Sequence, residues 1–239
     1  MQMDEKVFAD LDSLSRAALD ELLKIVRDTT ARNGRCALAL SGGTTPNRMY
    51  DIWAAEHRDE TPWDKLHLFW GDERYVPQDD PLSNFREARE KLISRVPIPP
   101  QNVHPVPTQL VAPELAAEAY EKDLRNFFGA SAPAFDLQLQ GLGVEGHTAS
   151  LFPGSPVLNE TQKWVAAVEV AAKPPRRITL TPVVLNAARR TFFLVSGSSK
   201  REIIGSLRAE KKSAMSEYPA ARLHPNGPVT WYLDRAAAS

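Results

Sequence analysis

The sequence predicts an α/β protein in which helices cover both faces of a mainly parallel sheet, within a single domain of residues 1–239. Two observations support this prediction. Short apolar runs alternate with amphipathic stretches along most of the chain, which is typical of repeated strand–helix units. The run CALAL at residues 36–40 is apolar at every position, which is typical of a strand buried on both faces.

The order of the expected elements follows from the apolar spacing. Apolar residues at three- and four-residue intervals predict a first helix over residues 12–31, with Asp12 as its N-cap and Asn33-Gly34 after its end. The other predicted helices begin near residues 46 and 84, span residues 113–128 and 198–207, and include a short one around residues 185–188. The predicted strands are residues 36–40, 66–70, 135–140, 164–170, 178–181, 192–195 and 229–233.

The composition excludes several classes of partner. The 239 residues carry a net charge of −1, so no basic surface is expected for nucleic acid or anionic membranes. The apolar runs are much shorter than a membrane span, and the N-terminus lacks the pattern of a secretory signal. The single cysteine, Cys36, permits no internal disulfide and fits a reducing compartment. We therefore expect a cytoplasmic protein that binds neither nucleic acid nor membrane.

The segment SGGTTP, residues 41–46, lies between a predicted strand and a predicted helix. Its glycines permit close approach of a ligand, and the amides at the start of a helix attract anions. Thr45 is expected to cap this helix and Pro46 to lie in its first turn. The segment is not a P-loop, because no Gly-Lys-Ser/Thr follows. An anion site and a plain tight turn before a capped helix both fit these residues.

The stretch FDLQLQGLGVEGHTASLFPGSP, residues 135–156, organises the rest of the chain. A strand precedes a turn with three glycines, and His147 follows at the carboxyl end of the strand, where open α/β sheets bind ligands. A lone histidine is more often structural, but this turn favours a catalytic loop with His147 as general base.

The glycine spacing in this stretch also fits a dinucleotide site, yet Pro153 ends any helix too early for such a site. No HExxH, paired CxxC or G-x-S-x-G motif is present, so no metal site or serine nucleophile is predicted.

Charged residues follow a second predicted strand in the segment GDER. Charges at the end of a buried strand are unfavourable unless they are solvated, paired or used in chemistry. Asp72 and Arg74 either pair with each other, or Asp72 orients a base or a sugar hydroxyl while Arg74 binds an anion. Arg176, Arg177 and Lys200 also lie at element ends, where they are either surface charges or part of a phosphate pocket.

Five segments resemble, in order, those of the 6-phosphogluconolactonase family: SGGTTP, GDERYVPQDDPLSN, GLGVEGHTASLFPG, RITLTPVVLNAA and FLVSGSSKRE. The resemblance covers nearly the whole chain. The related glucosamine-6-phosphate deaminases share the sheet and a glycine-rich phosphate loop, but GHTASLFP and GDER favour the lactonases. The resemblance implies a Rossmann-like α/β fold and hydrolysis of 6-phospho-D-glucono-1,5-lactone to 6-phosphogluconate in the pentose phosphate pathway. It also implies that no metal or nucleotide cofactor takes part.

The resemblance also implies roles for particular residues. His147 would take a proton from water as general base, and Arg74 or amides of the glycine loops would stabilise the oxyanion. Asp72 and Asn84 would order loops or bind sugar hydroxyls. The other residues implied in binding the substrate and its phosphate are Ser41, Gly42, Gly43, Thr44, Gly146, Arg177 and Lys200.

The chain departs from the family pattern at two places. Glu145 stands where an aspartate usually precedes Gly-His, and Gln138 and Gln140 interrupt a strand that is usually apolar. These glutamines indicate either a polar neighbour or a strand near the sheet edge. Two competing functions are a sugar-phosphate isomerase or deaminase with Asp72 as its carboxylate base, and a non-enzymatic effector-binding module of a regulator. No helix-turn-helix or basic patch supports the second.

Overall fold

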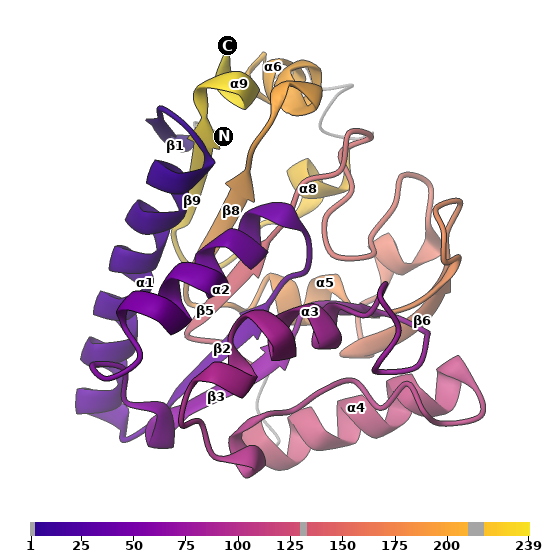
Figure 1. Cartoon of the computed structure of the whole chain (residues 1–239). Coiled ribbons are helices and arrows are strands. Elements are labelled where there is room, and N and C mark those ends of the chain that lie inside the picture. Colours follow the sequence, from indigo (N-terminus) through magenta and orange to yellow (C-terminus); the bar gives the residue numbers. More distant parts are fainter. Residues whose placement is uncertain (1–2, 130–132, 210–217) are drawn as a thin grey trace.

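The computed structural model describes residues 3–129, 133–209 and 218–239, and it confirms the predicted α/β class (Figure 1). Within these residues, a six-stranded parallel sheet has the order β1-β9-β8-β5-β2-β3, and a three-stranded antiparallel sheet has the order β4-β7-β6. The strands are β1 (Asp4–Phe8), β2 (Cys36–Leu40), β3 (Leu66–Trp70), β4 (Asp72–Arg74), β5 (Leu137–Gln140), β6 (Val165–Glu169), β7 (Arg176–Leu180), β8 (Thr191–Val195) and β9 (Val229–Asp234).

Helices surround the parallel sheet. They are α1 (Leu11–Asn33), α2 (Thr44–Glu56), α3 (Asn84–Lys91), α4 (Pro113–Phe128), α5 (Pro182–Leu185), α6 (Arg201–Arg208), α8 (Pro219–Arg222) and α9 (Arg235–Ala238). The bounds of α4 match the predicted helix of residues 113–128. None of the described helices is long and apolar enough to cross a membrane.

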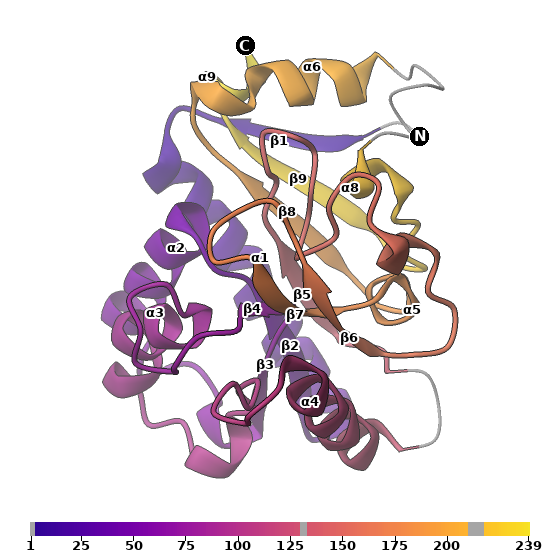
Figure 2. The ribbon, with the colours of Figure 1, turned by 90° about the vertical axis from the view of Figure 1, so that its right-hand side faces the viewer.

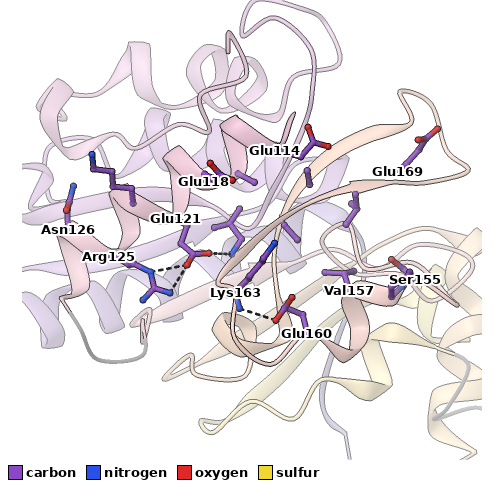
Figure 3. Close-up of a pocket in the computed structure, with 17 residues that line it drawn as sticks. Glu114, Glu118, Glu121, Arg125, Asn126, Ser155, Val157, Glu160, Lys163 and Glu169 are labelled. Carbon is purple, nitrogen blue, oxygen red and sulfur yellow. Dashed lines mark hydrogen bonds and ion pairs between the residues drawn. The ribbon is translucent and has the colours of Figure 1, made fainter. Parts of the chain in front are cut away.

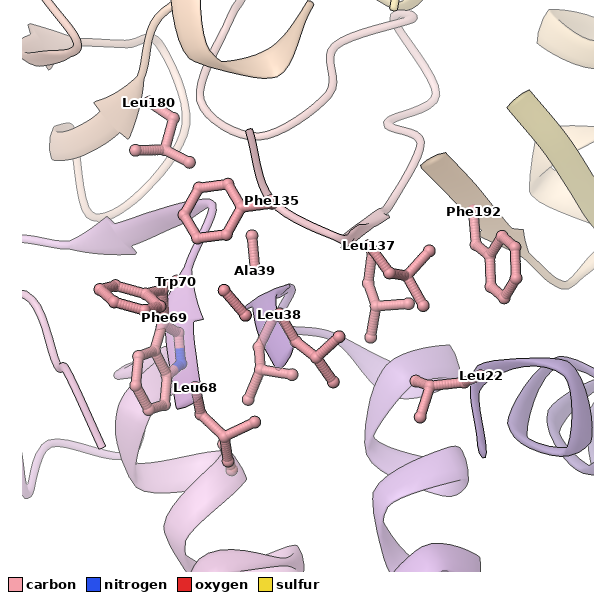
Figure 4. Packing of buried hydrophobic residues seen from close by; sticks show 14 of the residues in the cluster. Leu22, Leu38, Ala39, Leu68, Phe69, Trp70, Phe135, Leu137, Leu180 and Phe192 are labelled. Carbon is pink, nitrogen blue, oxygen red and sulfur yellow. The ribbon is translucent and has the colours of Figure 1, made fainter. Parts of the chain in front are cut away.

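Successive residues of the parallel sheet point to opposite faces, and one of these faces is covered by α1. Leu38, Leu137 and Phe192 belong to the same buried cluster as Leu22 of α1. Figure 4 shows Leu38 and Leu137 pointing to the side of the sheet on which Leu22 lies. Helix α2 packs beside α1, so the two long helices form one layer.

The opposite face of the parallel sheet is covered by α6 and α4. Phe193 of β8 and Trp231 of β9 stack with ring centroids 3.8 Å apart and cluster with Ile203 of α6. Phe69 of β3 lies on the same face by strand register, and its ring meets Phe127 of α4 edge-on at 5.1 Å. The prediction of helices on both faces is therefore confirmed.

The first helix begins earlier than predicted and has a different N-cap. The side chain of Asp10 accepts a hydrogen bond from the amide of Ser13 at 2.8 Å, and Ser13 completes a capping box. Asp12 lies inside the first turn and pairs with Arg16 at 2.9 Å, so the prediction of Asp12 as the cap is wrong. Apolar spacing alone does not decide between two aspartates so close in the chain. Gly34, with φ of 76°, ends the helix as predicted.

Helix α2 begins at Thr44, with Gly43 as its N-cap at φ of 105°, so the prediction of Thr45 as the cap is wrong. The hydroxyl groups of Thr45 and Ser196 form a hydrogen bond of 2.7 Å, which ties α2 to the segment after β8. Pro46 lies in the first turn as predicted. Because glycine has no side chain to cap the helix, the amides at its start are open to a ligand or a neighbouring segment.

The two glutamines of β5 lie in the middle of the parallel sheet, not at its edge. Nε2 of Gln138 donates to the carbonyl of Leu185 and to the hydroxyl of Thr191, both at 2.8 Å. Oε1 of Gln140 accepts from the hydroxyl of Thr148 at 2.7 Å. The polar-neighbour alternative is thus confirmed, since the glutamines tie α5 and the loop after β5 to the sheet.

The antiparallel sheet was not predicted as a separate unit. Strands β6 and β7 lie within or near the predicted ranges, but they pair as a hairpin instead of extending the parallel sheet, and the short β4 joins them (Figure 2). The amide of Leu180 donates to the carbonyl of Gly71 at 2.9 Å, which holds this sheet at the carboxyl end of β3. Strand β1 was also missed, because its DEKVF sequence has no buried run.

Candidate active site

One cavity of about 270 Å³ brings together most of the residues that the sequence singles out. It lies where β2, β5 and β8 end at one edge of the parallel sheet, while β4 and β7 contribute from the antiparallel sheet. The residues that line it are Ser41, Gly42, Gly43, Asp72, Arg74, Asn84, Gly141, Leu142, Gly143, His147, Ala149, Arg177 and Lys200.

Two predicted binding residues do not line the cavity. Thr44 is the exposed first residue of α2. Gly146 faces another segment, because a Cβ atom there would lie 2.5 Å from the ring of Tyr218. Conversely, the sequence analysis did not single out Leu142 and Ala149, since a leucine and an alanine in a loop carry no chemical signal.

The loop after β5 closes on itself and places His147 in the cavity. The amide of Gly143 donates to the carbonyl of His147 at 2.8 Å, and the amide of Gly146 donates to the carbonyl of Gly143 at 3.0 Å. The imidazole stacks on the ring of Phe152, with centroids 4.1 Å apart. A Cβ atom at Gly143 would lie 1.9 Å from Nδ1 of His147, so the imidazole needs glycine at this position.

Two features of the surroundings of His147 shift the pKa of its imidazole in opposite directions. Burial lowers the pKa of the imidazole below its ordinary value, and the nearby Glu145 carboxylate opposes that shift. Oε1 of Glu145 lies 3.2 Å from Nδ1 of His147, although the two atoms are not aligned for a hydrogen bond. The carboxylate of Glu145 thus faces one ring nitrogen, and the other nitrogen, Nε2, is left for a reacting group.

Asp72 is fixed by side chains from two other segments. Its Oδ2 accepts from the hydroxyl of Ser150 at 2.6 Å, and its carbonyl accepts from Nδ2 of Asn84 at 2.9 Å. A Cβ atom at Gly42 would lie 1.9 Å from Oδ1 of Asn84, so glycine is required where the loop after β2 meets α3. These contacts lock three loops together around the cavity. Asp72 and Arg74 form no ion pair with each other in the described part of the chain, so the first alternative for GDER, an Asp–Arg pair, is wrong.

Glu73 does not line the cavity but holds residues that do. Its buried carboxylate accepts hydrogen bonds from the amides of Arg74, Asn84 and Phe85 at 2.6, 2.8 and 2.7 Å, and from the hydroxyl of Ser83 at 3.0 Å. Burial raises the pKa of Glu73 to about 7, against the effect of these amides. The carboxylate joins β4 to the start of α3 and so sets the positions of Asn84 and Arg74.

Three cations line the cavity. Nε of Arg177 donates to the carbonyl of Pro174 at 2.7 Å, and Nη1 of Arg74 donates to the carbonyl of Leu82 at 2.7 Å. Burial, and then the charge of Arg74, lower the pKa of Arg177. Burial also lowers the pKa of Lys200, which indicates a cation without full hydration. Arg176 points away, over the ring of Tyr75 at 5.3 Å, so of the two adjacent arginines only Arg177 reaches the cavity.

The segment SGGTTP, residues 41–46, has a further partner that the sequence did not indicate. The amide of Gly43 donates to Oε2 of Glu87, a residue of α3, at 3.2 Å. Among the described residues, no group of three or more histidine, cysteine, aspartate or glutamate side chains is placed to hold a metal ion. The cavity therefore offers an imidazole and three cations, which together can bind an anion and move a proton.

Comparisons with known proteins show the family to which the chain belongs. Residues 9–231 match the family described as glucosamine-6-phosphate isomerases/6-phosphogluconolactonase. The chain is 43% identical over 210 residues to a 6-phosphogluconolactonase of Synechocystis sp., covering 87% of this chain and 85% of that protein. It is 38% identical to a 6-phosphogluconolactonase of Nostoc sp., covering 100% of this chain and 98% of that protein. The solved structure of 6-phosphogluconolactonase from Trypanosoma brucei superposes with a TM-score of 0.88 at 32% identity, covering 99% of this chain and 98% of that one.

Proposed function

The chain belongs to the family of glucosamine-6-phosphate isomerases and 6-phosphogluconolactonases, and we propose that it hydrolyses 6-phospho-D-glucono-1,5-lactone with His147 as general base. The relatives at 43% and 38% identity are named 6-phosphogluconolactonases, which supports this substrate and a place in the pentose phosphate pathway. We assign residues 1–239 to one lactonase domain.

The observation that carries the proposal is the meeting of one imidazole with three cations in a cavity of about 270 Å³. A phosphorylated lactone needs both features: a group that activates water near neutral pH, and positive charge some distance away for the phosphate. His147 supplies the first, and Arg177 and Lys200 with the amides of the loop after β2 supply the second.

Hydrolysis adds water across the bond between C1 and the ring oxygen. Nε2 of His147 takes a proton from a water molecule, and the resulting hydroxide attacks C1. The bond from C1 to the ring oxygen then breaks, and the imidazolium returns its proton to that oxygen, which becomes a hydroxyl. Glu145, beside Nδ1, stabilises the imidazolium while it exists. Arg74 stabilises the negative charge that develops on the carbonyl oxygen.

Asp72 serves as a fixed acceptor for a sugar hydroxyl in this scheme. Its carboxylate already accepts hydrogen bonds from Ser150 and Asn84, which supports a positioning role. A sugar-phosphate deaminase or isomerase would instead need an oxygen atom of this carboxylate free to take a proton from C2, and both oxygen atoms already accept hydrogen bonds. We therefore favour the lactonase over the deaminase.

A direct comparison of two substrates tests the proposal. The purified protein is given 6-phosphogluconolactone, with acid release followed in a pH-stat, and separately glucosamine 6-phosphate, with ammonia release followed. We expect hydrolysis well above the spontaneous opening of the lactone and no ammonia. Ammonia release from glucosamine 6-phosphate without lactone hydrolysis would replace the lactonase with the deaminase, and neither activity in a folded protein would overturn both.

A further inference from the structure

A second, larger hollow lies away from the proposed catalytic cavity. This α4–β6 groove, of about 930 Å³, runs between one side of α4, strand β6 and the segment of residues 155–163 (Figure 3). It shares no lining residue with the cavity around His147. An inference about the groove is therefore independent of the proposed function.

The groove opens on the edge of a sheet. All five residues of β6 line it, and since successive residues of a strand point to opposite faces, a hollow that touches all five follows the strand's edge. Strand β6 is the last strand of the antiparallel sheet, because its only sheet partner among the described residues is β7. An edge strand presents backbone donors and acceptors to a further strand.

The hydrogen bonds around β6 show which backbone groups face the groove. The amide of Thr181 donates to the carbonyl of Trp164, and the amide of Val170 donates to the carbonyl of Pro175, so the even-numbered residues of β6 face β7. The odd-numbered residues therefore face outward. Consistent with this, the outward amide of Val165 donates to the carboxylate of Glu121 at 3.1 Å. No hydrogen bond of this kind is found for the amide of Ala167 within the described chain.

The side chains that line the groove are partly apolar and partly charged. Five glutamates and three cations line the groove: Glu114, Glu118, Glu121, Glu160, Glu169, Lys122, Arg125 and Lys163. Glu121 is engaged by Arg125 at 2.6 Å, and Glu160 accepts three backbone amides, so these two are satisfied. Glu114, Glu118 and Glu169 are exposed and form no ion pair within the described residues. Figure 3 shows Glu114 and Glu169 at the same end of the groove, away from Arg125.

We propose that the α4–β6 groove binds an extended peptide segment of a partner protein, carrying lysine or arginine, as a fourth strand paired with β6. Main-chain hydrogen bonds to the part of the β6 edge beyond Val165, whose amide is occupied by Glu121, hold such a strand, and the acidic end selects cationic side chains. The five residues of β6 span about 17 Å, enough to pair with a peptide of similar length. A second copy of this chain is a poor occupant, because its own β6 lies beside α4 and it repeats the same negative charge.

The probe for this proposal is a fluorescently labelled hexapeptide of alternating valine and lysine, blocked at both ends. Its binding is followed by fluorescence anisotropy at low salt. We expect saturable binding that weakens as salt is added, because the charges at the groove are exposed. We expect no binding of the matched valine–glutamate peptide, and much weaker binding of a valine–lysine peptide whose backbone amides are methylated at alternate residues.

Two groove variants test the two parts of the recognition. Ala167→Pro removes an outward edge amide that forms no hydrogen bond in the sheet, and should lower the affinity for the valine–lysine peptide roughly threefold to tenfold. The double variant Glu118→Lys with Glu169→Lys should lower this affinity by at least about tenfold. The charge-matched control, Asp59→Lys with Glu202→Lys, lies outside the groove and should bind the peptide nearly as wild type does. Lactone hydrolysis and circular dichroism confirm that each variant is folded.

Three results would overturn the proposal. The first is the absence of binding when the valine–lysine peptide is present at about 1 mM, because even a weak site is expected to bind with a Kd of about that value. The second is equal binding of the methylated peptide, which would exclude strand pairing. The third is an equal loss in the groove variant and in the charge-matched control, which would show that net charge alone attracts the peptide.

Discussion

The proposed catalytic cavity and the α4–β6 groove differ in how their walls are built. The cavity, of about 270 Å³, collects residues from the ends of several strands, and its polar groups are held by other segments, as Asp72 is by Ser150 and Arg74 by the carbonyl of Leu82. The groove, of about 930 Å³, has one helix and one strand as its main walls, and its carboxylates Glu118 and Glu169 are exposed. Chemistry requires groups held in place, whereas peptide binding requires an open edge. We therefore propose the smaller hollow as the catalytic one.

The largest effect that this comparison predicts is at His147. His147→Ala should lower kcat for the phosphorylated lactone by about 10²–10⁴-fold, because it removes the proposed general base. Binding of 6-phosphogluconate, measured by calorimetry, should persist, since the proposed phosphate contacts lie on other residues. The lactone opens spontaneously, so the uncatalysed rate is subtracted at each pH.

The matched control for this variant lies in the groove. Glu118→Ala changes an exposed side chain of α4 and should leave kcat unchanged. A His147→Ala enzyme with nearly wild-type kcat would place the base elsewhere, with Asp72 as the first candidate. A loss of kcat in Glu118→Ala would break the separation of the two hollows.

A smaller effect is expected at the cations of the cavity. A charge-assisted contact contributes about 1.5–3 kcal/mol, so Arg177→Ala or Lys200→Ala should lower kcat/KM for the phosphorylated lactone roughly tenfold to a hundredfold. The unphosphorylated lactone should be a poor substrate whose kcat/KM is nearly unchanged. Arg176→Ala is the matched control, because this neighbour of Arg177 points over Tyr75 and not into the cavity. Equal losses on both lactones would assign Arg177 and Lys200 to structure rather than to phosphate binding.

The two hollows also differ in how visible they are in the sequence. Ser41 and His147 follow predicted strands in glycine-containing turns, and the parallel order of the strands brings such turns to one edge. The groove has no comparable signal, because the strand pattern of β6 is the same whether it pairs within the parallel sheet or in a separate hairpin. The pairing partner is set by tertiary contacts.

Contacts between distant segments could not be predicted from the sequence either. The hydrogen bond from Ser150 to Asp72 joins residues 78 positions apart, and that from Gly43 to Glu87 joins residues 44 positions apart. No local pattern reports either one. Gln138 and Gln140 did signal a polar neighbour, but Leu185, Thr191 and Thr148 could be named only once the strands were placed.

A modest, pH-dependent effect is expected at Glu145. Burial holds the pKa of His147 below its ordinary value, so wild-type kcat should be constant near neutrality and fall only in mild acid, as the imidazole is protonated. The Glu145 carboxylate raises that pKa, so Glu145→Gln should lower it further and move the acid limb to lower pH. Rate profiles between pH 4 and 8 check the direction, and a limb that moves to higher pH would contradict it.

The smallest effect compares one substitution in the two regions. Ala149, in the catalytic loop, has φ of 47°, a left-handed conformation that disfavours alanine by roughly 1–2 kcal/mol. Replacing alanine with glycine also frees the unfolded chain, which costs about 0.5–1 kcal/mol of stability. The two terms nearly cancel at Ala149, so Ala149→Gly should leave the free energy of unfolding within about 1 kcal/mol of wild type or slightly above it.

Ala166 of β6 is the matched control, because it is similarly half-buried but lies in an ordinary strand. Only the greater freedom of the unfolded chain then applies, so Ala166→Gly should destabilise the fold. Urea unfolding of both variants measures the difference. A larger loss in Ala149→Gly than in Ala166→Gly would show that the catalytic loop stores no strain, and that its backbone is held by packing alone.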